Sequence, residues 1–516
     1  MAPPGELVRN LIVLSNGIGV PPPPDAGTKP PLDIHLPLEA LGRELGMLSR
    51  ATHLFRQADA EGYVTVDTVT GKARPMDPAR FASWAESVVW PYRTGRDGPT
   101  FARMPRETAG LVLACDAFRD HVRQLRGINQ VRLPVWQGPP GQGEIRLLPA
   151  GWDEESGFYT LDAVPYDLDQ DPREARQWFI DTFNGFPFAD ERSRASLVML
   201  MLSPFIRGLM PSGERMLHGL IIANQARSGK SLLAQAVLAP VHGEAAAQSL
   251  DGNPKELRAT LDAIALEQAQ YCWLDDMGDL RNRTLNAFLT APRYKCRVLG
   301  FTKTAEARVE TLCIITGNGL DVGPEIAARC VIVDLWLDTD AAARKFRNII
   351  TPGWLASTQT RAASLSFLWA SVRNWTHHKK PLAEDATRPG FEAHASLAGS
   401  IVRAMLLGNP FTPRPALLGG DEESLAIRGL LTAAAERSWP EGREWRPQTM
   451  LELAEELGLL DTICPWSPNQ NLRQSLGHKL KLWRGRRLQD GQGRLFEFGR
   501  RGGHGGAIYP LRWITE

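Results

Sequence analysis

The sequence predicts an α/β protein of several domains. Four short apolar runs, at 220–222, 271–274, 312–315 and 331–335, have the length and the aliphatic content of buried strands. A helical segment over 231–238 follows the first run, and strands that alternate with helices are typical of a parallel sheet. With 516 residues, the chain is long enough for roughly three or four domains.

The composition predicts a soluble protein. Apolar residues make up 43% and charged residues 23% of the chain, as in ordinary globular proteins, and the net charge of +1 indicates no particular partner. The six cysteines form no Cys-x-x-Cys pair, so neither a zinc site nor a disulfide framework is predicted. The longest apolar stretch, around 197–206, is too short to span a bilayer, and no secretion signal is evident. We therefore expect a cytoplasmic location and no membrane contact.

A phosphate-binding loop is predicted after the first strand. Gly-Lys-Ser at a strand-to-helix junction is the core of such a loop. Gly229 lets backbone N–H groups curl around phosphates, Lys230 reaches the β- and γ-phosphates, and the Ser231 hydroxyl ligates Mg²⁺. The expected cofactors are ATP and Mg²⁺. The expected nucleotide-binding residues are consecutive in the sequence: Asn224, Gln225, Ala226, Arg227, Ser228, Gly229, Lys230 and Ser231.

Asn224 stands where the full loop pattern has its first glycine. That position often needs an unusual backbone angle, and Asn is the residue other than glycine that tolerates such an angle best. The half-motif alone describes an ordinary N-capped helix equally well. The polar residues at the ends of the later strands distinguish the two interpretations.

Two later strands end in polar residues that suit nucleotide hydrolysis. The strand at 271–274 leads into Asp275 and Asp276; the first would orient Mg²⁺ or its waters and the second would polarise the attacking water. The strand at 312–315 leads to Asn318, whose amide can hold that water. The alternatives are two surface acids and a turn-forming Gly-Asn.

Arg329 precedes the fourth strand. An arginine at this point can project into the nucleotide site of a neighbouring subunit and neutralise charge in the transition state. The alternative is a solvated arginine or a local salt bridge. The predicted catalytic residues are Lys230, Asp275, Asp276, Asn318 and Arg329, and the predicted metal ligands are Ser231 and Asp275.

The order phosphate loop, acid pair, Asn, Arg resembles the AAA+ class, and most closely the superfamily-three helicases and related phage or plasmid replicative ATPases. The resemblance covers about 215–337. It implies a β-hairpin between the acid pair and the strand that leads to Asn318. In the family, a basic residue at the tip of this hairpin contacts DNA in a central channel and moves along it. The matching segment is 297–304, where Lys303 is the expected tip residue and Thr304 departs from the usual Lys-His pair.

The C-terminal hundred residues predict a winged helix. Three helical segments precede a glycine-rich, basic hairpin, and 473–512 holds ten Lys or Arg against two acids. This local excess suits phosphate binding, although a winged helix can also contact protein. The expected DNA-binding residues, with the channel pair first, are Lys303, Thr304, Lys479, Lys481, Arg484, Arg486, Arg487, Arg500 and Arg501.

The predicted domains follow in order. They are a flexible leader (1–30), an N-terminal α+β accessory domain (31–165), a helical collar (166–215), an AAA+ ATPase core (216–340), a helical lid (341–415) and a winged-helix DNA-binding domain (420–516).

The function expected from the motif set is that of a ring-forming, ATP-dependent DNA helicase for replication of a mobile element. It would be a homo-oligomer, expected to be a hexamer, with single-stranded DNA in its channel and duplex DNA at the winged helix. One alternative is a DNA-bound ATPase switch that loads or remodels partners without unwinding. Another, motivated by Asn224, is a scaffold that does not hydrolyse ATP.

Overall fold

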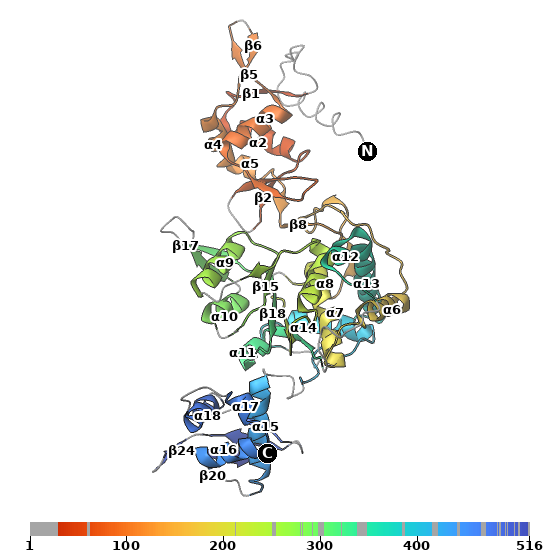
Figure 1. The fold of residues 1–516 in the computed structure, drawn as a ribbon. Coiled ribbons are helices and arrows are strands. Elements are labelled where there is room, and N and C mark those ends of the chain that lie inside the picture. Colours follow the sequence, from red (N-terminus) through yellow and green to blue (C-terminus); the bar gives the residue numbers. More distant parts are fainter. Residues whose placement is uncertain are drawn as a thin grey trace. The chain divides into compact units, whose positions relative to one another are not determined.

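The chain divides into two compact units, and the boundary in the sequence falls between Pro165 and Tyr166 (Figure 1). The computed structural model describes residues 29–58, 62–96, 98–211, 213–249, 254–278, 280, 282–291, 293–297, 304–320, 322–337, 348–383, 388–414, 422–440, 444–465, 471–481, 483, 487–490, 492, 494–499, 501–503 and 506–513. The predicted leader, apart from residues 29 and 30, lies outside the described residues.

The first unit mixes short strands and helices. Its described elements are β1 (Pro31–Asp33), α2 (Leu38–Ser49), β2 (Leu54–Gln57), β3 (Tyr63–Val66), β4 (Ala73–Pro75), α3 (Pro78–Val88), β5 (Trp90–Gly95), β6 (Gly98–Phe101), α4 (Arg106–Leu113), α5 (Asp116–Arg119), β7 (Gln124–Leu125), β8 (Gly127–Asn129), β9 (Pro134–Gln137), β10 (Glu144–Leu147), β11 (Gly151–Trp152) and β12 (Phe158–Thr160). The strands pair as β1-β5-β6, β4-β3-β2-β7, β11-β12-β8 and β10-β9.

Two apolar clusters hold this unit together. The larger one gathers side chains from α2, α3, α4 and α5, with Leu45, Phe81 and Phe118 fully buried at its centre. The smaller one is formed around Phe55 and Tyr159, whose rings meet edge to face at 5.8 Å. The folding unit therefore has a hydrophobic core of its own.

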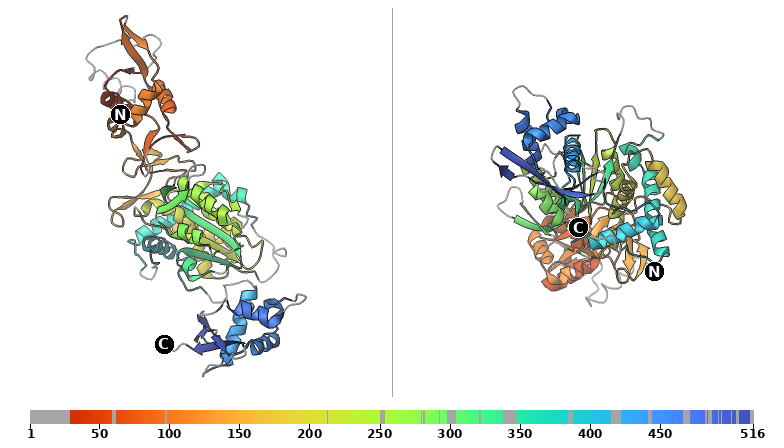
Figure 2. Two further views of the ribbon diagram at one scale, coloured as in Figure 1. Left: turned by 90° about the vertical axis from the view of Figure 1, so that its left-hand side faces the viewer. Right: turned by 90° about the horizontal axis from the view of Figure 1, so that it is seen from below.

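The second unit contains a parallel sheet with helices on both faces (Figure 2). The five strands are β13 (His218–Ala223), β14 (Gln248–Ser249), β15 (Tyr271–Asp275), β18 (Leu312–Asn318) and β19 (Cys330–Leu335). Their order across the sheet is β14-β15-β18-β13-β19, and every pairing is parallel. The four predicted strands are all present. Most extend by one to three residues beyond the apolar runs, because parallel strands are buried on both faces.

Successive side chains of these strands point to opposite faces of the sheet. Leu220 and Ile222 join a cluster that includes side chains of α9 (Pro254–Leu266), α10 (Arg283–Thr290) and α11 (Pro324–Ala327). On the other face, a Cβ at Gly219 would lie 3.0 Å from Leu200 of α7 (Glu191–Phe205). Glycine therefore allows that helix to approach the sheet closely.

Further elements of this part surround the sheet. They are α6 (Pro172–Phe183), η2 (Ile206–Leu209), α8 (Lys230–His242), the antiparallel hairpin β16 (Arg293–Arg297) and β17 (Thr304–Arg308), α12 (Pro352–Ala356), α13 (Thr358–His377) and α14 (Glu392–Ala404). The last three are the described helices of the predicted lid. No described helix combines the length and the hydrophobicity that crossing a bilayer requires.

The C-terminal part of this unit has its own core. It consists of α15 (Glu422–Glu436), β20 (Glu444–Trp445), α16 (Pro447–Glu456), α17 (Leu460–Ile463), α18 (Leu472–Lys481), β21 (Arg487–Gln489), β22 (Leu495–Phe498), β23 (Arg501–Gly503) and β24 (Gly506–Trp513). The sequence predicted a two-stranded hairpin after the helices. The structure instead has an antiparallel sheet in the order β20-β24-β22-β21, with β23 paired to β24. Phe496, Phe498 and Tyr509 are buried on it.

Two buried histidines are held as neutral rings. Nδ1 of His218 accepts a hydrogen bond from the Cys313 N–H at 3.2 Å, and its Nε2 donates to the Leu289 carbonyl at 3.1 Å. Burial is the main cause that lowers the pKa of His218 to about 4, and the charges of Arg215 and Arg329 add to it.

His394 has the same arrangement. Its Nδ1 accepts from the Leu217 N–H at 3.1 Å, and its Nε2 lies 3.0 Å from the Ser203 oxygen, whose hydroxyl donates to the Met199 carbonyl. Burial, assisted by His218, lowers the pKa of His394 to about 3. If Nδ1 of either ring were protonated, its N–H would face the backbone N–H that now donates to it, that of Cys313 or that of Leu217.

We predict that the second unit loses stability as the pH falls from 7 to 5. Both histidines have an ordinary pKa of 6.5 when unfolded and a lower one when folded, so the unfolded chain binds more protons in this range. The loss should reach about 1.4 kcal/mol per pH unit for each ring. Thermal melts at pH 7, 6 and 5 measure it.

The variant His394→Asn should lose about a third of this pH dependence, because the Asn oxygen can accept the Leu217 N–H without titrating. His218 and His242, whose pKa burial lowers to about 4 and about 3, keep the remainder. The variant His377→Asn, at an exposed position at the end of α13, is the matched control. A melting temperature that does not change between pH 7 and 5 would show that the rings do not govern stability.

Candidate functional site

The segment after β13 curls over the amino end of α8. β13 lies between β18 and β19, with Ala223 opposite Asn318 on one side and Leu335 on the other. Two residues of the segment have left-handed backbone: Arg227 with φ 59° and Gly229 with φ 101°. A Cβ at Gly229 would also lie 2.8 Å from the Phe186 ring, so this position requires glycine for two reasons.

The expectation of an unusual backbone angle at Asn224 is wrong. Among the described residues with a left-handed backbone, Asn224 is not found, and the left-handed turn falls on Arg227 instead. The Asn224 side chain donates to the Leu337 carbonyl at 2.8 Å and accepts from the Leu337 N–H at 3.0 Å. Asn therefore ties the start of the loop to the residue two places beyond β19, a contact that glycine cannot make.

Lys230 and Asn318 meet at the carboxyl edge of the sheet. Lys230 Nζ donates to Asn318 Oδ1 at 2.6 Å, and Asn318 Nδ2 donates to Asp276 Oδ1 at 3.3 Å. Burial lowers the pKa of Lys230, while the carboxylates of Asp276 and Asp275 act in the opposite direction. The buried ammonium thus lies beside two negative charges.

Ser231 and Asp275 form the second half of the site. The Ser231 hydroxyl donates to Asp275 Oδ1 at 3.0 Å, and the Thr316 hydroxyl donates to the same oxygen at 2.6 Å. Thr316 Oγ1 also accepts the Asp276 N–H at 2.9 Å. Asp276 has φ 52°, so its carboxylate turns away from the strand direction toward Asn318.

These contacts form one continuous chain from Lys230 through Asn318, Asp276, Thr316 and Asp275 to Ser231, in which the Asp276 backbone N–H makes the link to Thr316. Five of the six are residues that the sequence singled out. Thr316 is the residue that sequence reasoning missed. The available signal was a hydroxyl side chain at the end of an otherwise apolar strand.

The donor set suits Mg²⁺. The described residues contain no group of three or more His, Cys, Asp or Glu that could hold a metal ion. Mg²⁺, however, prefers oxygen ligands and is held by one or two protein side chains together with waters and substrate phosphates. The Ser231 hydroxyl and the Asp275 carboxylate, 3.0 Å apart, provide such a pair.

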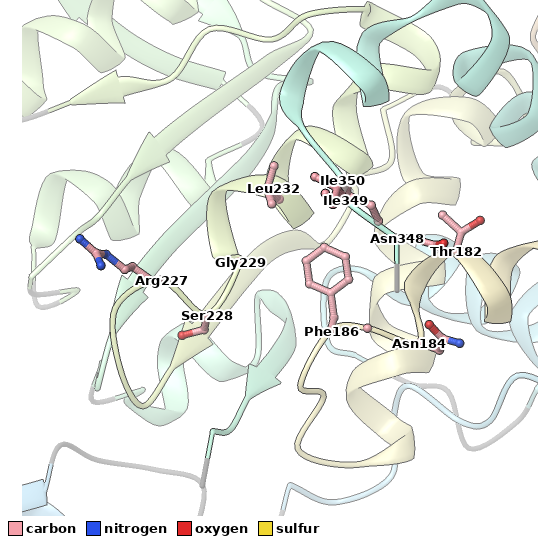
Figure 3. A pocket seen from close by; sticks show the side chains of 11 residues that line it. Thr182, Asn184, Phe186, Arg227, Ser228, Gly229, Leu232, Asn348, Ile349 and Ile350 are labelled. Carbon is pink, nitrogen blue, oxygen red and sulfur yellow. The ribbon is translucent and has the colours of Figure 1, made fainter. Parts of the chain in front are cut away.

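A cavity of about 190 Å³ lies beside the loop (Figure 3). Its walls come from the loop and the start of α8, from the end of α6 with the turn after it, and from the segment before α12. Figure 3 shows Phe186 between Gly229 and the 348–350 segment, with Arg227 turned away. The lining residues are Thr182, Asn184, Gly185, Phe186, Arg227, Ser228, Gly229, Leu232, Asn348, Ile349 and Ile350. No motif in the sequence identified Phe186, because it lies about forty residues before the loop.

A buried charge network holds the turn that carries Phe186. Asp334 of β19 accepts hydrogen bonds from Arg192 of α7 and from Arg414, and side-chain exposure is only 5% for both Asp334 and Arg192. The Ala189 N–H donates to the Asp334 carbonyl at 3.0 Å, and Phe188 bridges to Leu335. The turn is therefore attached to the edge strand of the sheet.

Arg329 lies at the opposite edge of the sheet from Lys230. Its carbonyl accepts the His218 N–H at the start of β13, whereas Lys230 follows the end of that strand. The two edges are roughly 17 Å apart, at about 3.3 Å for each strand residue. Arg329 Nη1 donates to the Glu325 carbonyl at 2.7 Å, and its side chain is 21% exposed. Arg329 therefore does not reach the phosphate loop of its own chain.

The expected DNA-binding residues are placed only in part. Lys303 lies outside the described residues, and Thr304 opens β17 opposite Arg297. Lys479 forms an ion pair with Glu423. Lys481, Arg487 and Arg501 lie in α18, β21 and β23, where only the backbone is described, and Arg484, Arg486 and Arg500 lie outside the described residues.

No protein-family model and no curated protein sequence matches the chain. Solved structures that are similar include two of the C-terminal region of NrS-1 in its apo A form. Each has a TM-score of 0.38, at 9% and 11% identity; they cover 93% and 92% of this chain and 100% of the other. Another is SCCmec type IV Cch, described as an active helicase, with a TM-score of 0.34 and 10% identity over 81% of this chain and 90% of the other. At these TM-scores the similarity carries no argument about function.

We predict that Asn224→Gly, which restores the usual loop pattern, destabilises the protein by about 1–3 kcal/mol. The variant removes both hydrogen bonds to Leu337. Gln225 Nε2 still donates to the Leu337 carbonyl at 3.2 Å, but the Leu337 N–H loses its partner. The matched variant Arg227→Gly should be neutral or stabilise by about 1 kcal/mol, because glycine adopts φ 59° without strain. The free energy of unfolding in urea measures both. Stabilisation by Asn224→Gly would contradict the role assigned to its side chain.

Proposed function

We propose that this chain is a ring-forming, ATP-dependent DNA helicase with an AAA+ ATPase core, serving replication of a mobile element. The observation that carries the ATPase proposal is the continuous contact chain from Lys230 to Ser231. It joins an ammonium, an amide, two carboxylates and two hydroxyls at the carboxyl edge of a parallel sheet. Ligands of open α/β sheets bind at this edge.

The strand order supports the choice of core. When the five strands are numbered by their order in the sequence, they lie across the sheet in the order fifth, first, fourth, third, second. The phosphate loop follows the first of them, β13. The acid pair ends the third strand and Asn318 the fourth. The resemblance to AAA+ ATPases implies this distribution of motifs, and a neighbouring cavity beside Gly229 offers room for the nucleobase.

The residues suggest how hydrolysis would proceed. Lys230 would pair with the β- and γ-phosphate oxygens, and Mg²⁺ held by Ser231 and Asp275 would neutralise their remaining charge. Asp276, oriented by the Thr316 hydroxyl and by Asn318, would accept the proton of the water that attacks the γ-phosphorus. Asn318 bonds to both Lys230 and Asp276, so its amide would sense whether the γ-phosphate is present.

Arg329 would complete the site of an adjacent subunit. Arg329 is too far from the loop of its own chain for contact. The nucleotide site that it can reach is therefore that of a second copy of the chain. This requires a closed homo-oligomer, for which we propose a hexamer. The β16–β17 hairpin, together with Lys303, which the sequence predicts as its tip residue, would contact single-stranded DNA in the channel. The basic C-terminal part, proposed as a winged helix, would hold duplex DNA.

We predict that the full chain hydrolyses ATP and separates a partial duplex in an ATP-dependent manner. Lys230→Ala should abolish both activities. Asp276→Asn should lower kcat by roughly 10²–10⁴-fold with little change in ATP affinity, because it removes only the proton acceptor. Thr290→Val, at a hydroxyl that bonds within α10, is a control outside the site. ATP hydrolysis without strand separation would favour the alternative, a DNA-bound ATPase switch that remodels partners.

Arg329 is tested by mixing variants. Arg329→Ala and Lys230→Ala should each be inactive, with a loss of roughly 10³–10⁵-fold for the arginine. Mixed rings should regain part of the ATPase activity, because the Lys230→Ala subunit still offers Arg329 to the intact loop of its neighbour. Arg74→Ala, at an exposed arginine of β4 that pairs with Asp67, is the control for a lost charge. No recovery on mixing, together with unchanged oligomer size, would assign Arg329 a role within its own subunit.

A further inference from the structure

The β5–β6 hairpin of the first unit carries three aromatic rings on one face. Trp90 and Tyr92 lie two residues apart in β5, so their side chains share a face, and Tyr92 is the direct partner of Phe101 in β6. The Trp90 and Tyr92 rings stack with centroids 5.6 Å apart and planes 20° apart. Trp90 and Phe101 are tilted at 6.4 Å. The rings form one aromatic surface.

This surface is not used by the core of the unit. The apolar cluster formed by α2 to α5 contains none of the three rings among its described members. Phe101 is 52% exposed, and Trp90 and Tyr92 are half-buried. An exposed group of large aromatic side chains indicates a binding site rather than a packing role.

Three exposed arginines lie close to these rings in the sequence, with Arg93 on the opposite face of β5 from Trp90 and Tyr92. Arg93 and Arg96 lie in the hairpin and Arg103 follows it, and all three are exposed. None of them has an ion pair with a described acid. Asp33 is the β1 partner of Tyr92, and Asp97, which follows Arg96 in the sequence, lies outside the described residues. The hairpin thus combines aromatic faces with an excess of positive charge.

We propose that the β5–β6 hairpin binds single-stranded DNA, with bases stacked on Phe101 and the Trp90–Tyr92 pair and phosphates paired with the arginines. Exposed rings interleaved with arginines fit a single strand, whose bases are available for stacking, whereas duplex bases are covered by each other. The charge excess fits a polyanion. A peptide partner with these needs would have to be acidic and aromatic, and it is an outcome of the test below.

This proposal does not depend on ATP hydrolysis. The hairpin belongs to the unit that ends at Pro165, while every residue of the nucleotide site belongs to the other. Binding through the hairpin should therefore occur without nucleotide and should persist in Lys230→Ala.

The test compares two oligonucleotides of equal length and charge, one of thymidines and one without bases, by fluorescence anisotropy with the full chain and no nucleotide. Phe101→Ala should weaken thymidine binding by roughly tenfold, the effect of losing one stacked base. It should leave binding of the strand without bases unchanged. Arg93→Glu with Arg103→Glu should weaken binding of both strands and reduce the salt dependence.

Two variants of the same unit serve as controls. Leu111→Ala removes an apolar side chain of α4 that is 53% exposed, matching Phe101, and Arg43→Glu reverses an exposed charge on α2. Neither should alter binding of either strand. ATP hydrolysis in the absence of DNA, measured on the same samples, should be equal for all variants.

Photocrosslinking separates the hairpin from other DNA-binding parts of the chain. A strand that contains 5-iodouridine should form adducts with aromatic residues between 90 and 103, and these should disappear in Phe101→Ala with Trp90→Ala. Equal loss of both oligonucleotides in Phe101→Ala, or adducts confined to other segments, would overturn the proposal. So would unchanged binding in all hairpin variants, which would favour a protein partner.

Discussion

The parallel register of β13 with its two neighbours is the constraint on which the site depends. Ala223 at the end of β13 lies opposite Asn318 of β18 and Leu335 of β19, so the three strands end together. Parallel strands place their carboxyl ends at one edge, and the polar residues that follow them therefore meet there. A shift by one residue would turn Asn318 away from Lys230, because successive side chains of a strand point to opposite faces.

The polar site is stabilised by mutual satisfaction of its groups. A buried ammonium or carboxylate alone would be costly, but each member of the chain from Lys230 to Ser231 has a partner of opposite charge or a hydrogen-bonding group. A bound phosphate would compete for the same groups. The observed contacts thus hold the side chains near the positions that catalysis would require of them.

The walls of the cavity depend on a second network, formed by Asp334 with Arg192 and Arg414. It joins the start of α7, the edge strand β19 and the segment after α14. Since the turn that carries Phe186 hydrogen bonds to β19 in the same place, the network positions the ring over Gly229. A change in any of these segments would therefore alter the position of Phe186 beside Gly229 through the buried ion pairs of Asp334, without direct contact to the loop itself.

Local sequence patterns were sufficient to predict the four strands, the loop between β13 and α8 and the polar residues at the strand ends. Each is encoded by neighbouring residues: an apolar run, a Gly-Lys-Ser junction, a pair of acids. What the patterns predicted poorly was the C-terminal sheet, where every described strand except the eight-residue β24 has only two to four residues and carries little periodic signal.

Only the tertiary structure decided how these pieces act together. The sequence suggested that Asn224 tolerates a strained backbone, whereas the fold gives its side chain a partner 113 residues away. Thr316 and Phe186 gained their importance from contacts across strands and between segments, which no local pattern encodes. By itself, the sequence determined which chemical groups are available and at which strand end each lies. Strand order and long-range packing decided which groups meet, because both depend on pairings between residues far apart in the chain.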